Sequence, residues 1–310
     1  MKFRTEIIIP PSDFKISHQD KMMMIGSCFV ESISEKLKNS AFRADVNPFG
    51  IMYNPISVLM TLKDILKRKE YTSDDLFFHQ EQYHSFSHHS RFSGTNKEAV
   101  INNINDRIKT ANDFISNADY LFVTFGTSSV YYQTENKQVV ANCHKLPAMS
   151  FVRKRIPVEE IVEQWHDFII QLREINPKIK LIFTISPIRH WKDGAHENQI
   201  SKSVLFLAVD KLMQNSEVYY FPSYELIMDD LRDYRFYAED MLHPNSSAID
   251  YIWEKFVDTY FASETKQLIK EWESIRQALN HRPFNPDSQE YKRFIEDAKK
   301  REAAFLEKIR

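Results

Sequence analysis

Two short motifs far apart in the chain hold the residue types of a nucleophilic site. Ser27 and Cys28 follow Gly26 at the end of an apolar run. Asp240 and His243 stand three residues apart much later in the sequence. A hydroxyl or thiol on the first turn of a helix lies near backbone N–H groups that favour its developing negative charge. A carboxylate on the same tight turn as an imidazole orients the ring as a base. The pattern predicts that Ser27 or Cys28 attacks a substrate with the help of His243.

The first motif reads Gly-Ser-Cys-Phe at residues 26–29, and the second reads Asp-Met-Leu-His at residues 240–243. Together they resemble the GSCFA family, which is distantly related to the SGNH or GDSL esterases, and the resemblance spans about residues 1–260. In SGNH enzymes the first block is Gly-Asp-Ser-Leu with Ser as the nucleophile, and the last is Asp-x-x-His. Aligning the first block on its glycine places Ser27 at the family Asp and Cys28 at the family Ser. The nucleophile is therefore one of these two residues, and we favour Cys28.

The resemblance implies a hydrolase or acyltransferase that forms an acyl-enzyme on Cys28 or Ser27, with His243 as base and then acid. It implies an ester substrate, with an O-acyl carbohydrate as one candidate class, and no cofactor. If Cys28 attacks, we expect the helix N-terminus and His243 to hold its pKa below that of a free cysteine. The alternative is a catalytically inactive module that binds a ligand or a partner. Its motivation is the third SGNH block, Gly-x-Asn, which here reads Gly-Thr-Ser at residues 126–128 and lacks the Asn.

An oxyanion hole needs donors besides the N–H of the nucleophile itself. SGNH enzymes take one from a glycine-bearing loop after the second strand, and residues 47–50 stand in that place. Arg189 and His190 follow a later predicted strand, and Arg189 is a candidate for an anionic group of the substrate, with a surface ion pair as the alternative. The predicted oxyanion and substrate-binding residues are Gly50, Gly126, Thr127, Ser128, Asn142, Arg189 and His190.

Short apolar runs alternate with amphipathic segments, which is typical of βα units and a mainly parallel sheet. The predicted strands are 22–26, 42–46, 120–125, 180–185 and 218–221. The predicted helices are 30–38, 55–67, 97–115, 158–175, 201–213 and 246–261. The order predicts an α/β protein, a three-layer α/β/α sandwich with a mainly parallel five-stranded sheet. This is the flavodoxin-like form that SGNH enzymes use, in which catalytic groups gather at the carboxyl ends of the strands.

The chain divides into a predicted SGNH-like domain over residues 1–261 and a charged helical extension over 262–310. The domain carries two predicted insertions, at about 77–94 and at 128–145, where the second reads as a short β-hairpin. In the extension 20 of 49 residues are charged. We expect it to form two helices that pack on the domain or on a partner subunit of a homo-oligomer.

Composition excludes several classes of protein. The 310 residues carry 41 basic and 43 acidic side chains, a formal charge of −2 that provides no general attraction for nucleic acid. No stretch reaches the ~20 apolar residues that span a bilayer, so we expect no membrane partner and a cytoplasmic protein. Two cysteines, Cys28 and Cys143, make no disulfide framework.

Cofactor and metal signatures are also missing from the sequence. No glycine-rich run follows the first predicted strand, so we expect no nucleotide cofactor. Four histidines cluster in the first insertion but match no zinc template; they are His79, His84, His88 and His89. We therefore predict no metal site.

Overall fold

The centre of the protein is a parallel sheet of five strands in the order β10-β9-β5-β1-β2. The structure is a computed structural model that describes residues 5–309. The strands are β1 (Lys21–Gly26), β2 (Arg43–Val46), β5 (Tyr120–Phe125), β9 (Lys180–Ile185) and β10 (Val218–Phe221). Counted along the chain this is the flavodoxin-like order 2-1-3-4-5, so the predicted fold class is confirmed. The strand order reverses between β1 and β5, where such sheets open a crevice for ligands.

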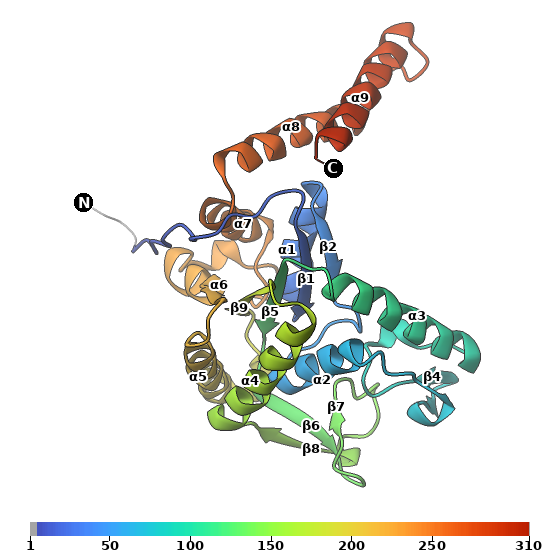
Figure 1. Ribbon diagram of the computed structural model, residues 1–310, viewed down its shortest axis with the longest axis vertical. Coiled ribbons are helices and arrows are strands. Elements are labelled where there is room, and N and C mark those ends of the chain that lie inside the picture. Colours follow the sequence, from blue (N-terminus) through green and yellow to red (C-terminus); the bar gives the residue numbers. More distant parts are fainter. Residues whose placement is uncertain (1–4, 310) are drawn as a thin grey trace.

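Helices cover both faces of the sheet, which makes the predicted three-layer sandwich (Figure 1). One face packs against α2 (Pro55–Leu66), α3 (Lys97–Ile115), α4 (Val158–Ile175) and α5 (Ala195–Leu212). The other face packs against α1 (Cys28–Asn39) and α7 (Ser246–Tyr260). The short helix α6 (Ser223–Glu225) follows β10.

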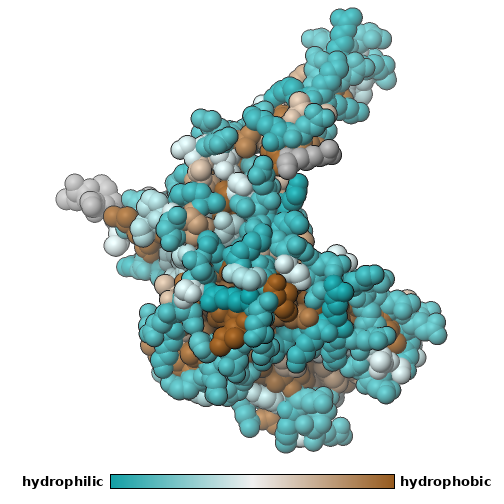
Figure 2. Space-filling model, viewed as in Figure 1, coloured by the Kyte–Doolittle hydropathy of each residue, from teal (hydrophilic) through white to brown (hydrophobic). Residues whose placement is uncertain are grey.

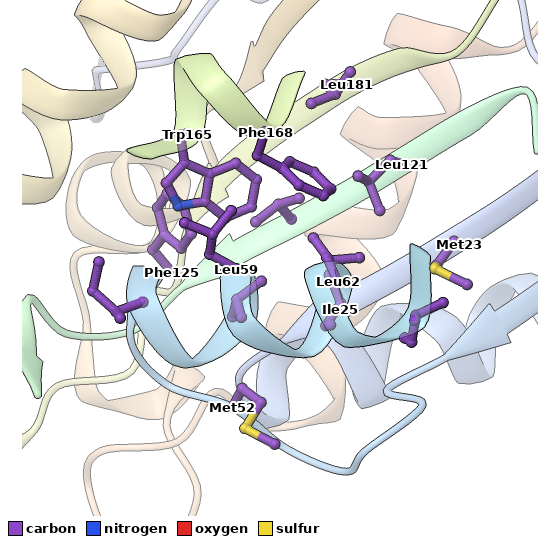
Figure 3. Packing of buried hydrophobic residues seen from close by; sticks show 14 of the residues in the cluster. Met23, Ile25, Met52, Leu59, Leu62, Leu121, Phe125, Trp165, Phe168 and Leu181 are labelled. Atoms are coloured by element: carbon purple, nitrogen blue, oxygen red, sulfur yellow. The ribbon is translucent and has the colours of Figure 1, made fainter. Parts of the chain in front are cut away.

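The alternating side chains of β1 explain why both faces are apolar. Successive residues of a strand point to opposite sides, so Met23 and Ile25 belong to the core under α2 and α4, while Met22 and Met24 belong to the core under α1 and α7. Figure 3 shows the first of these cores, where the indole of Trp165 packs among side chains from α2 and β5. Trp165 is fully buried, so this contact fixes α4 on the sheet.

The two insertions form small sheets of their own. Residues 77–94 contain the hairpin β3 (Phe77–His79) and β4 (Gln82–His84). In the second insertion β6 (Ser129–Gln133) pairs with β7 (Val139–Val140), as predicted, and also with β8 (Phe151–Arg155). The sequence did not predict β8, because its last three residues are all basic and mask the alternation of a strand.

The C-terminal extension consists of two helices, α8 (Ser263–Leu279) and α9 (Gln289–Lys308). The rings of Trp272 and Phe305 stack at 4.9 Å between them, and Arg276 Nη1 donates to the carbonyl of Asn39 at the end of α1. The pair projects from the sandwich (Figure 1), and its visible face is mostly hydrophilic (Figure 2). The boundary at residue 261 and the partner subunit remain predictions.

One predicted boundary is wrong by about two turns. We predicted a helix from residue 201, but α5 begins at Ala195. Its first turns, Ala-His-Glu-Asn-Gln, have no apolar face, so no helical pattern is visible there. Over residues 5–309 none of the helices is long and apolar enough to cross a membrane.

Candidate active site

The turn from β1 into α1 is built around Gly26. Its φ of 141° suits a residue without a side chain, and a Cβ there would lie 2.1 Å from the carbonyl oxygen of Thr124 on β5. Ser27 is the N-cap of α1, and Cys28 is the first helical residue. The next residues, Phe29 and Val30, are buried and anchor the helix. The strand end therefore presents Cys28 at the carboxyl edge of the sheet, beside the point where the strand order reverses.

The second motif forms a tight turn before α7. Asp240 Oδ1 accepts hydrogen bonds from the N–H groups of Leu242 and His243, both at 2.9 Å. Asp240 Oδ2 accepts from His243 Nδ1 at 2.5 Å. The bonds from the His243 N–H, the Leu242 N–H and the His243 ring lower the pKa of Asp240 to about 2. The carboxylate is therefore ionised at neutral pH and holds the imidazole in one orientation.

The two motifs meet at one edge of the sheet. Cys28 Sγ lies 3.7 Å from His243 Nε2, within hydrogen-bond range for sulfur. Because Nδ1 donates to Asp240, a neutral ring carries its proton there and presents an unprotonated Nε2 to the thiol. The structure thus brings together Cys28, His243 and Asp240, and the arrangement can move a proton from a thiol to an imidazole.

Ser27 and Cys28 have different surroundings. Ser27 is only 2% exposed, and its Oγ has no hydrogen-bond partner among the described residues. It does not cap α1 with its side chain. Cys28 is half-buried and contacts His243. The geometry therefore favours Cys28 over Ser27 as the partner of the base.

The expectation of a lowered thiol pKa is wrong. Burial raises the pKa of Cys28 above its ordinary value, and the N–H groups of Cys28 and Phe29 and the charge of Lys202 oppose this only in part. The helix N-terminus is present as expected, but desolvation of the charged form outweighs it. At neutral pH the sulfur carries its proton, so attack requires a base.

A cavity of about 610 Å³ opens beside Cys28 and His243. Its wall combines the β1 edge and the loop before α2 with residues of both insertions and the loop after β9. Four of the predicted oxyanion and substrate-binding residues line it: Thr127, Asn142, Arg189 and His190. Asn142 already uses its side chain, because Nδ2 donates to Ser90 and Oδ1 accepts from the N–H of His144.

The other predicted residues support the wall from behind. The N–H of Gly50 donates to the carbonyl of Asn47, and the N–H groups of Gly126 and Thr127 donate to the carbonyl of Tyr53. Neither glycine N–H is therefore available to an oxyanion. The predicted donor Ser128 is fully buried and spends both its N–H and its hydroxyl on the Oγ of Ser201.

The absence of a side chain at Gly126 leaves space beside His190 and Ser27. A Cβ at this position would lie 3.1 Å from the Tyr53 carbonyl, 3.2 Å from His190 Nε2 and 3.6 Å from Ser27 Cβ. The missing side chain therefore lets the His190 ring approach the β1 edge. Burial lowers the pKa of His190 to about 4, so the ring is neutral at pH 7.

Sequence reasoning missed Lys202 on α5. This side chain is fully buried, and its Nζ donates to the carbonyls of Gly126 at 2.7 Å and Ser186 at 2.6 Å. These carbonyls follow β5 and β9, so the lysine ties two strand ends together below the cavity. Burial lowers its pKa to about 7. No sequence signal marks it, because a lysine within a helix normally faces water.

The histidines of the first insertion pack against aromatic rings. His88 is 1% exposed and stacks on Phe49, and burial lowers its pKa to about 3. The ring centroids of His84 and His144 lie 4.6 Å apart. Among residues 5–309 no group of three or more His, Cys, Asp or Glu side chains could hold a metal ion.

Comparison with known sequences identifies two regions. The profile of the GSCFA family matches residues 21–256, and that of the GSCFA domain protein, C-terminal domain, matches residues 272–309. The first match contains both motifs of the site. No curated protein sequence matches the chain significantly.

Several solved structures are similar to the chain at low identity. They include a carbohydrate esterase of family 3 from Talaromyces cellulolyticus, 11% identical, with 81% of this chain and 99% of that chain covered and a TM-score of 0.37. An acetyl xylan esterase (Est2A) from Butyrivibrio proteoclasticus is 10% identical, with 78% and 64% covered and a TM-score of 0.39. A family two carbohydrate esterase from Clostridium thermocellum is 11% identical, with 83% and 66% covered and a TM-score of 0.38.

Proposed function

We propose that this chain, which belongs to the GSCFA family, is an ester hydrolase or acyltransferase with Cys28 as its nucleophile. His243 acts as base and then acid, and Asp240 orients it. The observation that carries the proposal is the continuous relay from Cys28 Sγ through His243 to Asp240, with contacts of 3.7 and 2.5 Å. The relay borders a cavity large enough for a small substrate.

The first half-reaction acylates the thiol. His243 Nε2 takes the proton of Cys28 as Sγ forms a bond to the ester carbonyl carbon. The tetrahedral intermediate then collapses, the C–O bond to the alcohol breaks, and His243 returns the proton to the leaving oxygen. Because burial raises the pKa of Cys28, the proton moves during attack and not before it.

The second half-reaction removes the acyl group. His243 takes a proton from water or from an acceptor hydroxyl, whose oxygen attacks the thioester carbon. The C–S bond breaks and the proton passes to Sγ, which restores the thiol. Water gives hydrolysis and another hydroxyl gives acyl transfer. The resemblance to SGNH enzymes suggests an O-acyl carbohydrate as substrate, and a cytoplasmic setting would keep Cys28 reduced.

The oxyanion requires donors that are not already in use. The N–H of Cys28 lies at the first turn of α1, where backbone N–H groups have no acceptor within the helix. The neutral ring of His190, which Gly126 admits to the β1 edge, is the side-chain donor in this proposal. A His tautomer with its proton on Nε2 would replace the Asn that the third motif lacks.

The test is covalent labelling of the nucleophile. Wild type, Cys28→Ala and Ser27→Ala are treated with a fluorophosphonate and with iodoacetamide, and the labelled residue is located by mass spectrometry. We expect label on residue 28 and loss of ester turnover in Cys28→Ala. Cys143→Ala is the matched control, because Cys143 lines the same cavity. Full turnover in Cys28→Ala with none in Ser27→Ala would transfer the role to Ser27. No label and no turnover in any variant would favour the binding module.

A further inference from the structure

The wall of the cavity is positively charged. Four cationic side chains line it, against one carboxylate, Asp193; the cations are Lys145, Arg153, Arg189 and Lys192. Both guanidinium Nη atoms of Arg153 donate to the two oxygens of Asp193, so this pair is neutralised. Within residues 5–309 no carboxylate forms an ion pair with the other three cations. The cavity therefore holds uncompensated positive charge.

Arg189 is the least solvated of these three cations. It is half-buried, whereas Lys145 and Lys192 are exposed. Its Nε is buried without a hydrogen-bond partner among the described residues. Its Nη2 donates to the sulfur of Met228 at 3.3 Å, and a thioether is a weak acceptor. A half-buried guanidinium that lacks an anionic partner is costly unless a ligand supplies one.

The position of Arg189 links it to the reacting groups. It lines the cavity of Cys28 and also a second cavity of about 480 Å³, whose wall includes Asp240. A group bound to Arg189 would therefore lie in the same cavity that Cys28 and His243 line. The planar fork of a guanidinium matches the two oxygens of a carboxylate or a phosphate.

We propose that Arg189 binds an anionic group of the substrate, so that the site selects esters carrying a carboxylate or a phosphate over neutral ones. This inference rests on the proposed function, because the bound anion is part of an ester substrate only if the protein acts on esters. The anion site itself is a property of the cavity wall.

The test compares two alkylating reagents that differ in charge. Iodoacetate and iodoacetamide transfer a group of similar size to Cys28, and the ratio of their rate constants is referred to the same ratio for a small free thiol. We expect wild type to favour iodoacetate, and Arg189→Met to reduce that preference about tenfold or more, as for loss of a hydrogen bond to a charged group. Arg189→Lys should retain part of it.

The control variant is Lys192→Met, which removes a charge from the same wall at an exposed position. It should change the ratio less than Arg189→Met, and 1 M salt should abolish most of its effect. Equal effects of the two variants would overturn the proposal, because the preference would then come from the summed positive charge of the cavity wall and not from a site at Arg189.

Protection experiments identify the anion and do not depend on a variant folding. Succinate and inorganic phosphate are each tested for saturable protection of wild-type Cys28 against iodoacetamide, and the more protective one names the group. If neither protects and the charge preference is absent, Arg189 binds no anion, while ester turnover by Cys28 still stands. If Cys28 reacts with neither reagent, its role as nucleophile fails, and calorimetric binding of the two anions to wild type and Arg189→Met decides the anion site.

Discussion

Replacing the buried Lys202 with Met should destabilise the protein in a pH-dependent way. In wild type the Nζ donates to the carbonyls of Gly126 and Ser186. Met is similar in length and apolar, so it fills the space but leaves both carbonyls without their donor. Each lost bond to a buried carbonyl costs on the order of 1–3 kcal/mol. At low pH the wild-type lysine is protonated, and the cost of burying its charge destabilises the wild type and so reduces the difference between the two proteins.

The sign of the pH effect follows from the lowered pKa. The folded protein holds Lys202 with a pKa of about 7, against an ordinary value of 10.5. Between these values the unfolded chain binds a proton that the folded protein has released, so the free energy of unfolding rises with pH from about 7 upward. From pH 6 to pH 9 the rise is roughly 2–3 kcal/mol at 1.36 kcal/mol per unit. Lys202→Met lacks this rise. The loss in its free energy of unfolding relative to wild type should therefore be larger at pH 9 than at pH 6, by roughly 2–3 kcal/mol.

Urea unfolding of both proteins at pH 6, 7.5 and 9 measures the difference. The control is Lys211→Met, the same substitution on the same helix at an exposed position where Lys211 pairs with Glu159. Its effect should stay within about 0.5 kcal/mol at each pH. If Lys202→Met loses the same free energy of unfolding at pH 6 and at pH 9, then Lys202 does not lose its proton in the folded protein over this range, and the reasoning is refuted.

The remaining predictions concern the site itself. Asp240→Asn should lower kcat for a phenyl ester by about 10⁴ in a protein that still unfolds cooperatively in urea, because the imidazole loses its orienting anion; activity within tenfold of wild type would contradict the relay. His190→Ala should lower kcat by about 10²–10³ with little change in KM, and His190→Gln should recover part of it, as expected for an oxyanion donor. Gly26→Ala should reduce the free energy of unfolding by about 3–5 kcal/mol, measured by urea unfolding, since its Cβ would lie 2.1 Å from the Thr124 carbonyl.

The central sheet could be predicted closely because its strands are continuous apolar runs. The strands at 120–125, 180–185 and 218–221 have the predicted bounds, since each run is bordered by polar or loop residues. β8 and the first turns of α5 could not be predicted, because their polar side chains carry no periodic apolar face. The position of β8 depends on its pairing with β6, and the first turn of α5 is held by Asn198, whose Oδ1 accepts from the N–H of His190; both are tertiary contacts.

The residue types of the candidate site and their grouping could be predicted from the sequence, but the electrostatics of the site could not. The spacing of Asp240 and His243 predicts a turn that joins them, and the structure has that turn. The choice between Ser27 and Cys28 depends on which side chain contacts His243, and sequence spacing does not contain that information. The raised pKa of Cys28 depends on burial by residues distant in the chain. The burial of Lys202 could not be predicted either, because it also depends on residues distant in the chain.

In the proposed mechanism, His190 supplies the oxyanion donor that the third motif lacks because its Asn is replaced. Thr127 and Ser128, which stand near that position, direct their hydroxyl groups towards Ser201. Gly126 remains, and the space above its Cα is where His190 Nε2 approaches. A neutral imidazole can donate one hydrogen bond, as an amide does, and burial keeps this ring neutral at pH 7. The glycine therefore matters for the ring that it admits, and a Gly-to-Ala change there should reproduce the kinetic effect of losing His190.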